Sequence, residues 1–355
     1  MISAKALLET AFPKKNTAQK LHKYVTSVPE LSVLILFVIA AYIFMGVFSK
    51  IEGTEFLSSS SVWLIVFSCF IISTAIAIFA VLAGIGGGVV FTPLMLAFTS
   101  IDTMVIRSTG LVVAMFSGLI SSGPFMRKGL SSIRIIVFSA VPITIGALAG
   151  AKGAIYFSDA MGATGDALVR LVLGIIIAFC CILFIRGGKK WEYPEATGED
   201  RLGKKLGLSF SYWEESLGKE INWQSQRVLA GGLLMFGVGL MGGFFGLGGG
   251  WAITPVFNIV MGTPLKVAAA SSGILLAISD GTAAWQYMNY GAMIVVFAGP
   301  WMLGQVVGGI MGAHILSKIR VSIIRYLLIF ILGFTALKLL ARGIEEFTGF
   351  GIPFL

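Results

Sequence analysis

The 355-residue sequence has few charged residues and almost no histidine. Asp, Glu, Lys and Arg together make up only 12% of it, two residues are histidine, and 57% are hydrophobic. Water-soluble globular domains carry about twice that charged fraction. Three cysteines all fall within apolar runs and form no disulfide or metal-binding pattern. This composition excludes a soluble domain, and repeated apolar runs of about 20 residues predict an all-α polytopic membrane protein.

Residue groupings typical of enzymes are also missing. The sequence has no His/Glu spacing that suggests a metal site, and Asp280 is the one acid clearly inside an apolar run. No nucleophile has an evident base. We therefore expect no enzyme, cofactor or metal site. The formal net charge of +9 comes mainly from loops that flank the apolar runs, which an excess of basic residues in cytoplasmic loops explains better than nucleic-acid binding.

One glycine-rich motif occurs twice. G-I-G-G-G-V-V-F-T-P occupies residues 84–93, and G-L-G-G-G-W-A-I-T-P occupies residues 246–255. Glycine leaves the backbone uncovered and proline has no N–H to donate. Hydrocarbon does not tolerate such backbone unless protein or a water-filled cavity surrounds it. A doubled, glycine-broken segment at membrane depth is typical of the binding site of a secondary transporter.

Further matches follow each motif in the same order and indicate a duplication. The matched pairs are Ser108-Thr109-Gly110 with Ser271-Ser272-Gly273, Gly129 with Gly291, Pro142 with Pro300, and Gly146-x-x-x-Gly150 with Gly304-x-x-x-Gly308. Small residues at that last spacing let membrane helices approach closely. We assign the chain to a basic N-terminus with an anchor helix (1–61), repeat one (62–186), a cytoplasmic interfacial loop (187–226), repeat two (227–342) and a C-terminal tail (343–355).

The apolar runs predict the positions of the helices. An extra N-terminal transmembrane helix covers residues 31–49. Repeat one contains 62–83, a short helix at 89–98, then 104–122, 134–154 and 167–186. Repeat two contains 227–247, a short helix at 251–261, then 267–287, 291–313 and 320–341.

Four regions are rich in basic residues: the N-terminus, 123–134, 186–227 and 314–325. All four lie in the cytoplasm if each short helix carries the chain across the membrane, which gives the two repeats inverted topology. If the short helices re-enter instead, the repeats are parallel and at least two basic loops lie outside. The inverted arrangement is preferred because the basic loop changes place between the repeats. The N-terminus is then cytoplasmic, and the protein is a multi-pass membrane protein.

The glycine motifs supply the main candidate binding groups. Each motif leaves backbone N–H groups unpaired at the start of a short helix, and helix N-termini bind anions well. Hydroxyl side chains of both repeats are candidates to line the same cavity. The predicted substrate-binding set is Gly86, Gly87, Gly88, Thr92, Ser108, Thr109, Gly248, Gly249, Gly250, Thr254, Ser271 and Ser272, together with Arg107. The alternative is that the glycines only permit tight helix crossing and that the hydroxyls bond their own backbone.

Two ionisable residues within or beside the apolar runs have competing interpretations. Asp280 is either a proton-coupling site or a structural partner of a basic residue or hydroxyl. Arg107 stands beside the Ser108-Thr109 pair, so it either attracts an anion or, at the end of a predicted span, extends its head to the membrane interface.

The doubled G-x-G-G-G-x-x-x-T-P pattern, followed by a Ser/Thr-Gly segment and a span opened by glycine, resembles the TauE/SafE sulfite exporter family over residues 62–341. The resemblance implies movement of sulfite, organosulfonates or related small sulfur-containing anions across the lipid bilayer of the bacterial cytoplasmic (inner) membrane. We expect a secondary transporter coupled to protons or another ion, and specifically an exporter. Arg107 and Asp280 depart from the usual small or uncharged residues at their positions. The alternatives are a passive anion channel and a non-transporting membrane module that binds a partner through the 187–226 loop; the oligomeric state stays open.

Overall fold

The computed structural model describes residues 59–83, 86–127, 129–186, 198, 200–214, 219–316 and 321–348. The predicted anchor helix at 31–49 and the end of the chain from residue 349 lie outside this part. The described helices of repeat one are α4 (Ser59–Ala83), α5 (Gly88–Phe98), α6 (Thr103–Arg127) and α7 (Ile133–Arg186). Those of repeat two are α9 (Val228–Phe245), α10 (Gly250–Pro255) with the π-helix η3 (Val256–Val260), α11 (Leu265–Tyr290), α12 (Val295–Leu316) and α13 (Val321–Thr348).

These helices confirm the all-α prediction apart from one two-stranded hairpin. Four described segments are long and apolar enough to cross a membrane: Thr103–Ile120, Ile133–Gly162, Val228–Phe245 and Val267–Tyr290. Outward faces are apolar as well. Val137, Val141 and Ile145 of α7 recur at one-turn spacing and are each more than half exposed. A stripe of exposed aliphatic side chains suits lipid and not water.

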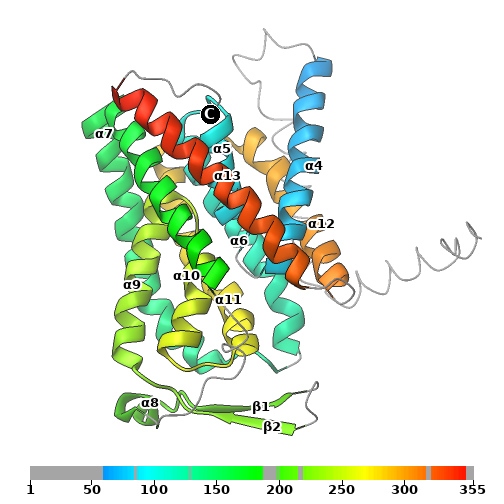
Figure 1. Ribbon diagram of the computed structural model, residues 1–355, viewed down its shortest axis with the longest axis vertical. Helices are drawn as coiled ribbons and strands as arrows, with labels where there is room; N and C mark the ends of the chain where they lie inside the picture. Colours follow the sequence, from blue (N-terminus) through cyan, green and yellow to red (C-terminus); the bar gives the residue numbers. More distant parts are fainter. Residues whose placement is uncertain are drawn as a thin grey trace, which may run out of the picture. The chain divides into compact units, whose positions relative to one another are not determined.

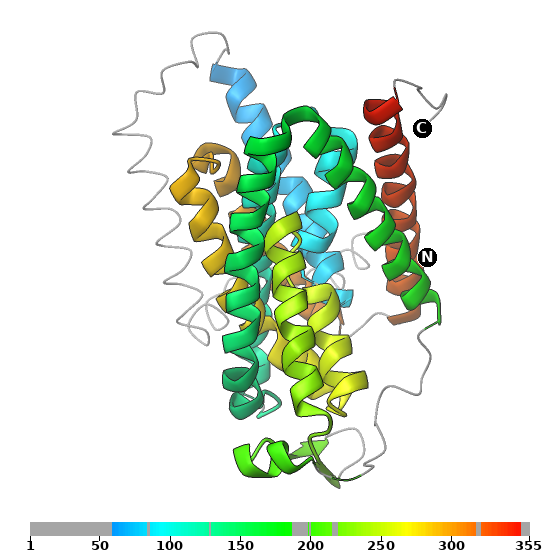
Figure 2. The same ribbon diagram turned by 90° about the vertical axis from the view of Figure 1, so that its left-hand side faces the viewer.

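α7 contains both of the helices that were predicted at 134–154 and 167–186. They are joined at Gly162, whose φ of 52° and ψ of −132° are not helical. Glycine tolerates this left-handed region because it has no Cβ. The chain therefore folds back on itself, as the two green arms in Figure 2 show, and α13 packs along the second arm, where Leu340 lies against Gly174 and Gly343 against Leu171.

Helices of the two repeats exchange partners. In α7, a Cβ on Gly146 would strike the carbonyl of Phe236 in α9, and a Cβ on Gly150 would strike that of Leu240. In the other pair, Gly304 of α12 faces Ser73 of α4 in the same way, and Gly308 faces Thr74. The repeated glycine spacing thus lets parallel helices of different repeats pack closely against each other. Small residues four positions apart are expected to do this in membrane helices. The two crossings are visible as α7 beside α9 and α4 beside α12 (Figure 1).

The central helices α6 and α11 also come one from each repeat, and Gly118 of α6 meets the carbonyl of Gly273 in α11. The second short helix returns the chain to the end where α9 begins. The N–H of Gln226, just before α9, donates a 3.0 Å hydrogen bond to the carbonyl of Met261, just after η3. Eleven helical residues span only about 16 Å, roughly half a hydrocarbon core. The break at residues 246–249 therefore lies well inside the bundle.

The predicted 187–226 loop contains structure that its sequence did not indicate. α8 (Arg201–Leu206) precedes an antiparallel pair, β1 (Phe210–Glu214) and β2 (Lys219–Trp223), in which Phe210 lies opposite Trp223. This unit lies at the end of the bundle where α9 starts (Figure 1). Asp200 Oδ2 accepts a 3.0 Å hydrogen bond from the N–H of Val228, and Arg134 Nη1 donates one of 2.9 Å to the carbonyl of Gly207.

Candidate functional site

The two glycine motifs are in direct contact inside the bundle. The hydroxyl of Thr92, in the first motif, donates a 2.6 Å hydrogen bond to the carbonyl of Gly246, which opens the second. A Cβ on Gly88 would lie 2.6 Å from the carbonyl of Leu247 and 2.7 Å from that of Gly110. Packing is therefore sufficient to require glycine at position 88. The interpretation that these glycines permit close crossing is correct here, and the same crossing brings both broken backbones to one place.

The motifs adopt the same backbone shape. Gly86 and Gly248 occupy equivalent positions and have φ values of +79° and +72°. Each is followed by a short helix whose first hydrogen bonds return to Gly87 and Gly249, from the N–H groups of residues 90 and 252. The N–H groups of residues 88–89 and 250–251 precede those first donors, so the helices give them no partner. They carry the partial positive charge of a helix N-terminus.

Asp280 lies against the second motif. Its side chain is 1% exposed, and Oδ1 accepts a 3.1 Å hydrogen bond from the neighbouring Ser279 hydroxyl. A Cβ on Gly248 would collide with Oδ2. The backbone N–H of Gly249 faces the same carboxyl group, yet among the described residues Oδ2 has no partner with hydrogen-bond geometry. A basic partner within 4 Å is likewise missing from the described part. Of the structural interpretation, the basic partner is therefore not supported, whereas the hydroxyl partner is present as Ser279.

Arg107 lies inside the bundle, and the interpretation that it extends to the membrane interface is wrong. Its side chain is fully buried, with the guanidinium carbon 5.6 Å from the ring centre of Phe244. Tyr287 interacts with it from α11 while donating a 2.9 Å hydrogen bond to the carbonyl of Gly243. These residues come from repeat two, which is why the position of Arg107 at a span end did not reveal its burial. A Cβ on Gly246 would collide with the Arg107 backbone, so the arginine stands beside the first residue of the second motif, the residue whose carbonyl binds Thr92 of the first.

Within the described residues, Arg107 forms no ion pair with a carboxylate. Its Nη1 donates a 3.8 Å hydrogen bond to Met104 Sδ, and its Nε has no hydrogen-bond partner. Burying an uncompensated guanidinium is costly. Thr109 and Thr254, which were predicted to line the site, also have hydroxyls without a partner among the described groups. The region around the motifs therefore offers several hydrogen-bond donors without acceptors. An oxyanion would supply those acceptors.

Gln305 is a site residue that the sequence gave little reason to select. Its Nε2 donates to the carbonyl and the hydroxyl of Ser73, which fixes the amide orientation. Its Oε1 then points at Gly87, where a Cβ would collide with it, and has no donor in the described structure. The signal was its place inside the G-x-x-x-G stripe of α12. Each glycine turn thus faces one buried, unpaired side-chain oxygen: Gln305 at the first and Asp280 at the second.

The repeated serines hold turns together. The hydroxyl of Ser108 donates a 3.0 Å hydrogen bond to the carbonyl of Ala292, in the turn before α12. At the matching position of repeat two, Ser271 Oγ accepts a 3.2 Å hydrogen bond from the N–H of Ser132, in the turn before α7. Ser272 bonds the carbonyl of Ala269 in its own helix. The geometry gives these three hydroxyls a structural use, and their predicted contact with substrate stays a prediction.

The described residues include no cluster of three or more His, Cys, Asp or Glu side chains that could hold a metal ion. What the arrangement offers is a meeting of two helix N-termini with one buried cation, two free hydroxyls and one buried carboxyl group. The donors suit a small anion, and the carboxyl group suits a proton.

Comparison with known proteins gives two matches. A model of the family described as "Sulfite exporter TauE/SafE" matches residues 23–161 and 69–339. The chain is 24% identical over 270 residues to the "Probable membrane transporter protein YunE" of Bacillus subtilis (strain 168), across 74% of this chain and 93% of that protein. No solved structure matches the chain.

Proposed function

The chain belongs to the sulfite exporter TauE/SafE family of membrane transporters, and we propose that it exports small sulfur-containing oxyanions, such as sulfite or organosulfonates, as a secondary transporter. The observation that carries the proposal is the buried Arg107. It lies beside Gly246 of the second glycine motif, fully covered, with no carboxylate partner in the described structure. A mobile anion that arrives from water supplies the missing negative charge and leaves again, whereas a fixed carboxylate would block the site.

The proposed topology is a pair of inverted repeats. The exchanged crossings support it, because each repeat supplies an equivalent stripe to the other: α7 to α9 and α12 to α4. The hydrogen bond between Gln226 and Met261 supports it too, since the short helix brings the chain back as the inverted arrangement requires. The basic regions, the α8–β1–β2 end of the bundle and the N-terminus then face the cytoplasm of the bacterial inner membrane.

We assign Asp280 to coupling. A buried carboxyl group with one unpaired oxygen is stable when it carries a proton and costly when it does not. An anion bound at the adjacent motif makes protonation of Asp280 more favourable, and a proton on Asp280 makes binding of the anion more favourable. Export of an anion is then linked to movement of a proton through the same site.

The test is flux in proteoliposomes with sulfite, sulfoacetate, taurine, thiosulfate and sulfate, with and without a proton gradient. The proposal expects saturable movement of at least one sulfur oxyanion and acceleration by an opposing pool of the same anion. Non-saturating flux without that exchange would identify a passive channel instead. If sulfur oxyanions do not move while another class of solute does, the substrate assignment is wrong.

A further inference from the structure

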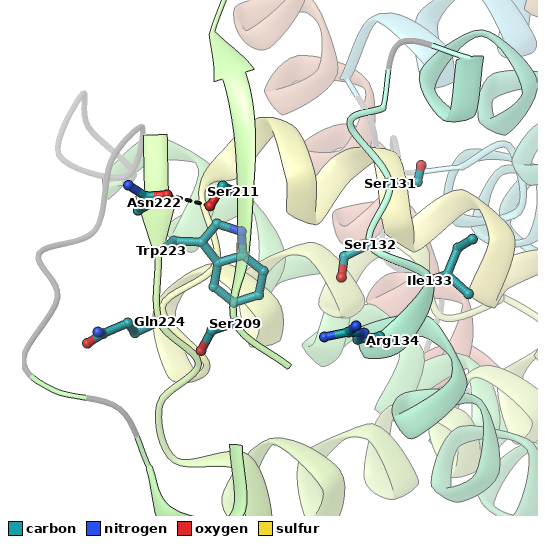
Figure 3. A pocket seen from close by; sticks show the side chains of 9 residues that line it. All are labelled: Ser131, Ser132, Ile133, Arg134, Ser209, Ser211, Asn222, Trp223 and Gln224. Carbon is teal, nitrogen blue, oxygen red and sulfur yellow. Dashed lines mark hydrogen bonds between the residues drawn. The ribbon is translucent and has the colours of Figure 1, made fainter. Parts of the chain in front are cut away.

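A polar pocket lies far from the glycine motifs, at the end of the bundle that carries α8 and the β1–β2 hairpin. It has a volume of about 540 Å³ and is an open pocket between the turn before α7 and the hairpin. Its lining residues are Ser131, Ser132, Ile133, Arg134, Ser209, Ser211, Asn222, Trp223 and Gln224. Figure 3 shows the two walls facing one another, with Ser132 and Arg134 on one side and the Trp223 ring extending from the other.

The lining residues carry positive charge and hydrogen-bond donors without a carboxylate. Arg134 is their one charged member, and its Nη1 bond to Gly207 leaves further N–H groups of the guanidinium free to donate. Asn222 Oδ1 accepts a hydrogen bond from the hydroxyl of Ser211, and its amide nitrogen points away from the wall with Ser132 and Arg134 (Figure 3). An anion matches this set better than a cation or a neutral apolar molecule.

The clearest sign of a missing ligand is the indole of Trp223. The residue is only 5% exposed, yet its Nε1 has no hydrogen-bond partner within the described structure. An unpaired buried donor is costly, so native proteins rarely leave one without an acceptor. A ligand oxygen in the pocket would satisfy it.

The start of α7 adds a second source of positive potential. The first hydrogen bond of this helix runs from the N–H of Ile136 to the carbonyl of Ser132. The N–H groups of residues 133–135 therefore precede the helical ladder, at the wall that carries Arg134. Both the helix end and the guanidinium favour negative charge in the same space.

The pocket is joined to the helix that carries Asp280. Ser131 Oγ donates a 3.1 Å hydrogen bond to the carbonyl of Ala270, and the N–H of Ser132 donates to Ser271 Oγ. From Ser271 to Asp280 is nine residues, or about 14 Å along α11. The wall of the pocket is thus attached to the helix that lines the proposed central site.

We propose that this pocket is a second oxyanion site, which binds the sulfur oxyanion before it reaches the glycine motifs. The proposal rests on the proposed function for the identity of the anion and for its loading role. Arg134, the Trp223 indole and the start of α7 contact the ligand. Its volume is large enough for an organosulfonate with its carbon chain as well as for sulfite. Phosphate, free or on a lipid headgroup, has the same chemistry, and the experiment separates these sources.

The test measures binding of sulfite, sulfoacetate and inorganic phosphate by calorimetry to the full-length protein in nanodiscs made once with zwitterionic lipid and once with anionic phosphatidylglycerol. Asn222→Asp changes little in shape but places a negative charge in the pocket, so it should weaken the pocket binding step about tenfold. Trp223→Phe removes the indole donor and should weaken it about threefold to tenfold. Arg201→Gln removes an exposed charge from nearby α8 and should leave binding unchanged.

Unchanged binding in both pocket variants would overturn the site. Tighter binding of phosphate than of either sulfur compound, or loss of binding in anionic nanodiscs alone, would overturn its assignment to the transported anion. In flux assays the two pocket variants should raise the half-saturating concentration for anion supplied from the hairpin side and leave the maximal rate unchanged. An unchanged half-saturating concentration would overturn the loading role. Absence of flux from the unaltered protein would contradict the proposed function, while the binding data still decide the pocket.

Discussion

The hydroxyl of Thr92 donates a hydrogen bond to the carbonyl of Gly246 across 154 positions of sequence, and so fastens the first glycine motif to the second. Thr254 is the matching threonine of the second motif, and its hydroxyl has no partner among the described residues. Two equivalent threonines thus have different surroundings. One holds the motifs together, and the other remains free for a ligand.

Thr92→Val should destabilise the protein by about 1–3 kcal/mol, because the carbonyl of Gly246 loses its donor in a buried place. Thr254→Val should leave stability within about 0.5 kcal/mol of the unaltered protein and instead raise the half-saturating concentration of the transported anion. Thermal unfolding in detergent and proteoliposome flux measure the two effects. Equal stability losses in both variants would show that Thr254 is also structural.

Arg107→Met replaces a buried guanidinium that has no carboxylate partner in the described structure with an apolar side chain of similar length. The folded protein should be no less stable, because a buried charge without a carboxylate partner is costly. Anion affinity should fall by about tenfold or more, since the charge-assisted hydrogen bonds are lost. Arg107→Lys is the matched variant that keeps the charge, and it should recover part of the affinity. Unaltered affinity in Arg107→Met would remove the arginine from the binding site.

Asp280→Asn keeps the size of the side chain and removes its ability to carry and release a proton. Anion flux in this variant should no longer depend on the proton gradient, although the protein should insert and fold normally. Ser279→Ala, which removes only the hydrogen bond to Oδ1, is the control and should retain gradient dependence. A full response to the gradient in Asp280→Asn would exclude this residue from coupling.

Gly243→Ala and Gly237→Ala compare two glycines of the same helix. A Cβ at Gly243 would collide with the carbonyl of Ala147 in α7, whereas a Cβ at Gly237 meets nothing within 4 Å. Gly243→Ala should therefore cost about 1–3 kcal/mol. Gly237→Ala should be neutral or stabilising by up to about 1 kcal/mol, because alanine favours helix. Denaturant unfolding of both variants measures the difference, and equal stabilities would contradict the tight crossing of α7 and α9.

Local sequence was sufficient to place the helices, because each is a long apolar run bounded by polar or glycine residues. The observed bounds of α4, α5 and α10 with η3 differ from the predicted ones by only a few residues. The contact between the two glycine motifs could also be expected, since a repeated break in apolar segments has to be covered by protein. Sequence periodicity and composition therefore predict the helix positions and the burial of the glycine breaks.

The surroundings of single side chains could not be predicted in the same way. Arg107 is buried because Phe244 and Tyr287, more than 130 positions later, close over it. The hairpin of β1 and β2 was missed because its strands are five residues long and their faces mix polar and aromatic residues, so no alternation marks them. Gln305 lies in a glycine stripe whose partner helix only the fold identifies.

The exchange of helices between the repeats has a consequence for biogenesis. Ser73 of α4 donates its hydrogen bond to the carbonyl of Trp301, 228 positions later. During synthesis, α4 therefore enters the bilayer long before α12 exists, and its glycine-facing groove must be occupied by lipid or by the insertion machinery until α12 is made. Neither repeat can complete its own packing, so the nascent chain reaches its native state only after the C-terminal third has been inserted.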